Sequence, residues 1–355
     1  MNKLNDLVIL PCFSIEPNKC SSFNRIFWRA KLNKEYEKEQ HEINGTEAPT
    51  AFKTKSKSIK RAFHNFEISE NAYRTLKRKM SWLYYLAKPR HVVTYNGKDI
   101  FNFKMGFMTL TLPSKQRTPT AELTKTLFNQ FLTEIRQKTK MQNYIWRLEF
   151  QKNGNAHYHI ATDTYLDYFF VLKTWNRILS NAGYVEPYTM KHTGMSLSQY
   201  NTAYNPNGEI EFKTMANRYA KGCKHSWTQP PTVDVKSVIS NRAIANYIAK
   251  YFSKDADSNS LCNELDTPEN SKSLRLWFCS RSLSKLNSIT NFCDAVEYDI
   301  FSVVKCCQKI KTVIFKYATV FYYDIQKLLP QSREFVERLL HSYSYSTGYL
   351  PAGFT

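Results

Sequence analysis

Two short segments that alternate apolar and polar residues restrict the fold of this chain more than any other feature. YIWRLEF (144–150) and AHYHIA (156–161) both repeat with period two, and the polar link KNGN (152–155) lies between them. Period two is typical of a β-strand with one buried face, and a short link containing glycine is typical of a turn. The two segments are therefore predicted to pair as an antiparallel hairpin.

The number of residues in the hairpin loop decides which side chains share a face. A two-residue turn at Asn153-Gly154 would place Phe150 opposite His157 and would divide the apolar residues between the two faces, whereas a loop with an odd number of residues unites them. A three-residue loop with Gly154 or Asn155 in a left-handed conformation meets this need. The apolar face would then hold Trp146, Leu148, Phe150, Tyr158 and Ile160.

The same register gathers Glu149, His157 and His159 on the opposite face. Two imidazoles and a carboxylate on one strand face are a possible ligand set for a divalent ion. An H-x-H pair by itself is more often a pair of ordinary surface or core histidines, so the metal hypothesis depends on the third ligand. Packing and chemistry require one geometry here, which favours Glu149 as that ligand.

The remaining pattern predicts alternating strands and helices without long apolar strands, which favours an α+β fold with a central antiparallel sheet and flanking helices. Residues 184–210 lack periodicity and predict a long loop or an insertion. The other predicted elements are a helix over 69–87, two strands around Asn96-Gly97, a strand over 104–113, a helix that follows Thr118-Pro119, a helix over 166–181, a strand over 232–238 and a helix over 240–254.

Composition changes divide the chain into three predicted regions. Residues 1–90 form a basic, irregular N-terminal extension, residues 91–256 form the core domain, and residues 257–355 form a mixed C-terminal region with an amphipathic helix near 331–341. The polar stretch beyond Asp255 is the clearest boundary. The sequence assigns no role to the two outer regions.

The charge of the chain points to an anionic partner. Fifty Lys and Arg against thirty Asp and Glu give a formal net charge of +20, and residues 51–90 hold eleven basic residues and two acids. Such patchiness favours nucleic acid over a merely soluble basic protein. Twenty-three Tyr, twenty-three Phe and six Trp accompany these cations. Exposed rings beside cations stack unpaired bases, so single-stranded nucleic acid is the expected ligand.

Several classes of protein are disfavoured by what the sequence lacks. The eight cysteines form no C-x-x-C pair, which argues against a zinc ribbon and a disulfide framework and indicates reduced thiols in a cytosolic compartment. Apolar runs are too short for a signal peptide or a membrane span, so an intracellular protein without a membrane partner is expected. A G-x-x-x-x-G-K-[ST] motif is missing, so a partner must unwind any duplex.

A second group of reactive side chains occupies the predicted helix 240–254. Tyr247 and Tyr251 are four residues apart, hence on one helical face, and Lys250 and Lys254 follow each by three residues. An apolar stripe runs along the same helix, so the tyrosines alone would be read as core residues. Beside a two-histidine site in a basic protein, they become candidate nucleophiles.

These segments together resemble the HUH replication initiators. FMTLTLP (107–113) looks like their first motif, NAHYHI (155–160) their metal motif and YIAKYFSK (247–254) their tyrosine motif. The closest likeness is to initiators of microvirus-type single-stranded DNA phages and related bacterial plasmids, which LRLWFCSRSLSKL (274–286) also resembles. The resemblance covers roughly residues 91–290 and implies an RRM-like palm. Tyr158 departs from it, since many relatives carry an aliphatic residue there.

The resemblance implies a function for each motif. Glu149, His157 and His159 would hold Mg2+ or Mn2+, with Mn2+ well suited to two imidazoles and one carboxylate. Tyr247 or Tyr251 would attack a phosphate of origin DNA, which gives a 5′-phosphotyrosine and a 3′-hydroxyl that primes rolling-circle replication, and the displaced strand would be rejoined. The two lysines that follow the tyrosines, Lys250 and Lys254, would offset charge. Host helicase and DNA polymerase in the bacterial cytoplasm would complete the process.

Other functions remain open at this stage. An HUH transposase or a plasmid-mobilisation relaxase would use the same chemistry, and a non-enzymatic DNA-binding protein would use the histidines and tyrosines only structurally. An RNA-binding or membrane-surface protein would account for the charge and for none of the motifs. Thr109 and Thr111 share a strand face, where ordinary β-propensity and a place beside the metal are nearly equal interpretations.

Overall fold

The computed structural model describes residues 7–28, 68–88, 90–93, 100–103, 105–238, 264–267, 274–292, 311–316 and 318–346. The chain divides into two compact units, residues 1–60 with 285–354 and residues 61–284. These bounds differ from the predicted regions 1–90, 91–256 and 257–355. The physical reason is strand pairing, because strands from both ends of the chain share one sheet and residues 277–279 pair within the other.

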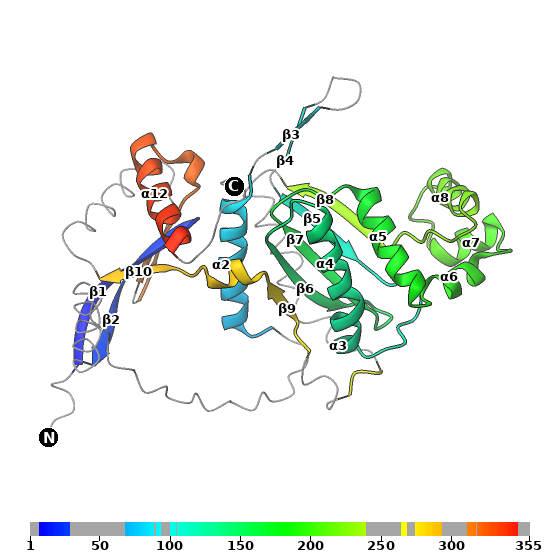
Figure 1. The fold of residues 1–355 in the computed structure, drawn as a ribbon, viewed down its shortest axis with the longest axis horizontal. Coiled ribbons are helices and arrows are strands. Elements are labelled where there is room, and N and C mark those ends of the chain that lie inside the picture. Colours follow the sequence, from blue (N-terminus) through cyan, green and yellow to red (C-terminus); the bar gives the residue numbers. More distant parts are fainter. Residues whose placement is uncertain are drawn as a thin grey trace. The chain divides into compact units, whose positions relative to one another are not determined.

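The unit 61–284 is built on an antiparallel sheet of five strands in the order β8-β5-β7-β6-β9 (Figure 1). Every neighbouring pair in this sheet is antiparallel and helices flank it, so the predicted α+β class is confirmed. The strands are β5 (Met105–Leu110), β6 (Tyr144–Phe150), β7 (Ala156–Thr162), β8 (Val233–Val238) and β9 (Trp277–Cys279).

The β6–β7 hairpin has the predicted register. Leu148 pairs with Tyr158, and Glu149 pairs with His157. The backbone N–H of Gln151 donates to the carbonyl of Asn155 at 2.9 Å, which leaves a three-residue loop that Gly154 ends with a φ of 77°. Glycine adopts this left-handed conformation without steric cost. The prediction of an odd-numbered loop is therefore confirmed.

Helices cover the apolar face of the sheet. Leu148, Tyr158, Trp146 and Ile160 are all buried on this face. Packed against them are α3 (Thr120–Leu123), the π-helical stretch η2 (Thr124–Phe128), α4 (Asn129–Lys138) and α5 (Tyr168–Asn181). The ring of Phe128 stacks on Tyr158 at a centroid distance of 4.0 Å. One core thus fixes the strand pair that carries the histidines.

The predicted helix over 69–87 is confirmed as α2 (Glu70–Leu86), whose first turn is capped by the Ser69 hydroxyl accepting from the Ala72 N–H. The strands predicted on either side of Asn96-Gly97 pair as β3 (Arg90–Val93) and β4 (Ile100–Phe103). Residues 94–99, with the predicted turn, lie outside the described residues. The predicted strand over 232–238 is β8, and the predicted helix over 166–181 is α5.

The long loop predicted over 184–210 is wrong, and the alternative of an insertion is correct. The segment folds as α6 (Val185–His192) and α7 (Leu197–Tyr204), and α8 (Phe212–Lys224) follows. Ser196 begins α7 with a reciprocal capping box to Gln199. These helices are short, and polar and aromatic residues fill them, so no apolar stripe indicated helix in the sequence.

The unit formed by the two chain ends contains an antiparallel sheet in the order β10-β1-β2-β12-β11. Its N-terminal strands correct the prediction of an irregular lead, while the helix predicted near 331–341 is confirmed. The elements are β1 (Leu7–Glu16), β2 (Lys19–Trp28), α10 (Arg281–Lys285) at the boundary between the units, β10 (Ile289–Phe292), β11 (Lys311–Phe315), β12 (Ala318–Tyr322), η4 (Ile325–Lys327) and α12 (Pro330–Ser346).

Two sequence expectations concern the whole chain. Cys12, Cys20, Cys223 and Cys279 are free thiols, which agrees with the absence of a disulfide framework among the residues described. In the same residues, no helix combines the length and the apolar character that crossing a bilayer requires.

Candidate functional site

A row of polar side chains crosses the face of the sheet opposite α4 and α5. Residues paired directly across antiparallel strands point to the same side, and His159 of β7 pairs with Thr109 on β5 and with Arg147 on β6. Asp234 of β8 pairs with Thr109 and extends the row to the edge strand. The next row along the hairpin holds the pair Glu149 and His157.

The three predicted ligands lie together on this face. The Nε2 atom of His159 is 3.0 Å from Oε2 of Glu149, and the rings of His157 and His159 have centroids 4.5 Å apart. On its other side, the His159 ring places Nδ1 at 3.3 Å from the hydroxyl of Thr109. Thr109, one of the two threonines singled out in the sequence, thus contacts the group directly.

Arg147 is a charged member of this face that the sequence analysis missed. Its side chain is nearly buried, and its Nε lies 3.7 Å from Oε1 of Glu149. The same period-two pattern that placed Glu149 with the histidines also places residue 147 there, so the signal was present in the sequence. A guanidinium beside the carboxylate makes the face less acidic and suits it to an anionic substrate.

Burial sets the protonation states of two of these groups. Burial, with the neighbouring charge of His159, lowers the pKa of His157 to about 4, so its imidazole is neutral at pH 7. Burial alone would raise the pKa of Glu149. The hydrogen bond and charge of His159, with the charges of Arg147 and His157, outweigh burial and lower that pKa. A neutral imidazole and an ionised carboxylate are the forms that bind metal ions.

The unpaired atoms at the site test whether a cation suits it. Oε1 of Glu149 and Nδ1 of His157 are buried and have no hydrogen-bond partner in the protein. Buried polar atoms are nearly always paired, and both of these atoms can act as metal ligands. The donor set therefore fits a divalent ion. In the described parts of the chain, however, no three His, Cys, Asp or Glu side chains are arranged to hold an ion, since Glu149 bonds to His159 directly.

A buried hydrogen-bond network supports the strand that carries the histidines. The Gln116 side chain accepts from the Ala156 N–H at 2.9 Å, and its backbone N–H donates to the Asn155 side chain at 2.9 Å. The Gln116 amide also donates to the Thr120 hydroxyl, and Thr120 in turn donates to the carboxylate of Asp266. The start of β7 is thereby fixed to the start of α3 and to a distant segment of the chain.

Tyr158, the residue that departs from the family resemblance, points into the core between the two histidines. Its side chain is fully buried, and its hydroxyl lies 2.7 Å from Oγ1 of Thr124. Burial raises the pKa of this phenol well above its usual range, so it stays protonated. The structure therefore gives Tyr158 a packing role, which an aliphatic residue fills in many relatives.

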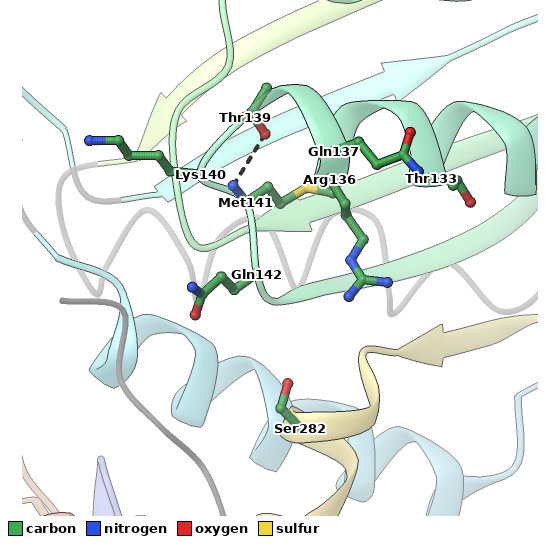
Figure 2. A pocket seen from close by; sticks show the side chains of 8 residues that line it. All are labelled: Thr133, Arg136, Gln137, Thr139, Lys140, Met141, Gln142 and Ser282. Atoms are coloured by element: carbon green, nitrogen blue, oxygen red, sulfur yellow. Dashed lines mark hydrogen bonds between the residues drawn. The ribbon is translucent and has the colours of Figure 1, made fainter. Parts of the chain in front are cut away.

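A shallow polar groove lies at the C-terminal end of α4 (Figure 2). Arg136 and Lys140 bring positive charge to it, and the Thr139 hydroxyl within it accepts from the Met141 N–H at 3.2 Å. Ser282 contributes from α10. Because α4 covers the apolar face of the sheet, this groove contains none of the predicted ligands.

The predicted tyrosine motif lies outside the described residues. Tyr247, Tyr251, Lys250 and Lys254 all belong to the stretch 239–263. Their roles, and the roles of Glu149, His157 and His159 as metal ligands, stay predictions.

Comparison with known proteins gives independent support for a role in replication. Residues 105–256, less than half of the chain, match the family model described as Replication-associated protein ORF2. The match begins at β5 and includes all the predicted site residues, the two tyrosines among them. It supports a replication initiator of some kind. Among curated proteins, no sequence matches this chain.

Proposed function

We propose that this chain is an HUH-type endonuclease that nicks single-stranded origin DNA through a tyrosine and so starts rolling-circle replication. The observation that carries the proposal is the β6–β7 register, which brings Glu149, His157 and His159 onto one face beside the buried Arg147. The similarity of residues 105–256 to replication-associated proteins supports it. Phage or plasmid genomes replicated in the cytoplasm of a bacterium are the proposed setting.

The chemistry divides between an ion-binding group and a nucleophile. Glu149, His157 and His159 would hold Mg2+ or Mn2+, which would polarise the scissile phosphate. The phenol oxygen of Tyr247 or Tyr251 forms a bond to phosphorus, the bond from phosphorus to the 3′-oxygen breaks, and the proton lost by the phenol is balanced by one gained at that oxygen. The products are a 5′-phosphotyrosine and a 3′-hydroxyl primer, and the reverse reaction rejoins the strand.

Charged side chains assist this transfer. Lys250 and Lys254, each three residues after a tyrosine, offset the negative charge that builds up on the phosphate. Since the sequence lacks a P-loop motif, a host helicase opens the duplex and a host DNA polymerase extends the 3′-hydroxyl.

The double variant H157A/H159A tests the metal assignment. With Mn2+ and a circular single-stranded genome, the wild-type protein is expected to become linked to a 5′ DNA end. The double variant should lose this adduct while it keeps DNA binding, because the phosphate-neutralising surface is separate from the ligands. EDTA should have the same effect on the wild-type protein. Undiminished cleavage by the variant would contradict the assignment.

A second candidate function is DNA binding without cleavage. The hydrogen bond between Glu149 and His159 favours it, because this bond satisfies both groups without an ion. Such a protein would bind DNA equally well with and without divalent metal, and it would form no covalent adduct under any condition. The adduct assay therefore separates the two functions.

A further inference from the structure

The helical insertion, residues 185–228 with α6, α7 and α8, has an aromatic core of its own. The buried ring of Trp227 contacts the rings of His192, Tyr200 and Tyr219 at centroid distances of 4.8, 5.4 and 5.7 Å. His192 also bonds at Nε2 to the Tyr204 hydroxyl, at 2.7 Å. The helices are thus packed as one small bundle, shown beyond α5 in Figure 1.

Close packing fixes which side of α8 faces inward. A Cβ on Gly222 would lie 2.1 Å from the ring of Trp227, so only glycine allows this contact without a shift. Trp227 itself has a φ of 57° and donates its N–H to the Gly222 carbonyl at 2.9 Å. Met215, on the same side of α8, is fully buried. The opposite side of the helix must therefore face solvent.

That outer side is basic. The sequence Phe212–Lys224 contains no acidic residue, and 3.6 residues per turn place its cations on one side of the helix. All of them are exposed, and in the described part of the chain the three lysines form no ion pair. Compensation of the helix dipole explains lysines in the last turn only. The basic face of α8 consists of Lys213, Arg218, Lys221, Lys224 and the adjacent His225.

We infer that the basic face of α8 binds the phosphates of duplex DNA that flanks the nicking site. This inference rests on the proposed function. A duplex carries one negative charge per about 1.7 Å of its axis, so it presents the densest array of phosphates to a row of cations. Proteins that hold single strands add aromatic rings on which bases stack. On α8 the ring of Tyr219 instead turns inward to Trp227.

The bundle is attached to the site by hydrogen bonds. The Asn176 side chain of α5 donates to the Pro230 carbonyl at 2.9 Å and accepts from the Thr232 hydroxyl at 2.5 Å. The Thr232 carbonyl accepts from the N–H of Thr111, which follows β5, at 2.9 Å. Duplex held by α8 would therefore be kept at a fixed distance from the strand that carries Thr109.

The triple variant K213A/K221A/K224A tests the inference, and K125A/K138A/K173A is its matched control. The control removes the same charge from exposed lysines on the helices that cover the apolar face. Binding to a duplex and to a single-stranded oligonucleotide of equal length is measured across salt concentrations. Loss of three phosphate contacts should lower the log-log salt slope for duplex by about two to three and weaken duplex binding by about tenfold or more.

The control variant should keep wild-type duplex affinity, and single-strand affinity should change little in either variant. Unchanged duplex binding by the α8 variant, an equal loss in the control, or a loss confined to single strands would overturn the inference. Nicking of a short single-stranded oligonucleotide is measured separately. Wild-type protein that binds duplex through α8 but never nicks would contradict the proposed function, whereas nicking with unaltered duplex binding by the variant would contradict only the inference.

Discussion

The environment of single side chains at the site explains why the same residues can serve an ion or bond to each other. Glu149 lies between the charge of Arg147 and the imidazole of His159, and it still has one buried oxygen without a partner. The buried, neutral His157 presents an unpaired nitrogen beside it. A divalent ion would satisfy both unpaired atoms at once, which is why we expect the metal-loaded state to be the active one.

Removal of one hydroxyl separates packing from chemistry at Tyr158. Tyr158→Phe removes a buried hydrogen bond to Thr124 and should lower the free energy of unfolding by about 1 kcal/mol, measured by denaturant titration. The effect of Thr124→Val should be smaller in the Tyr158→Phe background than in the wild type, because the two hydroxyls share one bond. Since Tyr158 faces the core, covalent nicking should persist. A variant with native stability and no nicking would show that Tyr158 acts in the reaction.

Among the elements, those with one apolar face were predictable and those without one were not. The β6–β7 hairpin followed from the alternation of its residues, and the register then placed Glu149 with the histidines. Helix α5 followed from its apolar stripe. Helices α6, α7 and α8 pack through tyrosine, histidine and tryptophan, which the sequence also uses on surfaces, so their burial around Trp227 could not be predicted.

The fit of α8 against Trp227 predicts a strong effect of one methyl group. Gly222→Ala places a Cβ inside the contact distance of the ring and should destabilise the bundle by roughly 1–3 kcal/mol. Tryptophan fluorescence during thermal unfolding should report the change. Asn217→Ala, at an exposed position of the same helix, is the control and should leave the transition within about 0.5 kcal/mol of the wild type. Equal stability of the two variants would contradict the packing described.

At the scale of the whole molecule, the organisation of the chain ends was beyond local sequence patterns. β1 pairs with β10, and β2 pairs with β12, so each of these ladders joins residues nearly 300 positions apart. Such long-range pairing has no signal in neighbouring residues. The α+β class was predictable because the core domain contains its own alternating strands, whereas the division into two units was not.

The charge of the whole chain predicts steep salt dependence of DNA binding. With a formal net charge of +20, the protein should bind DNA along a straight log-log line that weakens as salt increases. Unpaired or melted DNA should be preferred at the nicking site itself, with stacking on aromatic side chains adding to the phosphate contacts. Titration by fluorescence anisotropy at several salt concentrations measures the slope. A flat profile would contradict binding through phosphates.

The central claim is that Tyr247 and Tyr251 are the nucleophiles. Rolling-circle replication needs one strand transfer to begin and another to release a closed circle, and two tyrosines one helical turn apart provide both. The direct test is the covalent adduct between protein and the 5′ end of an origin oligonucleotide in Mn2+, measured for Y247F, Y251F and the double variant. Each single variant should keep some adduct, and the double variant should have none. Adduct formation by the double variant, or its complete loss in one single variant while the other behaves as wild type, would contradict the account of two alternating tyrosines.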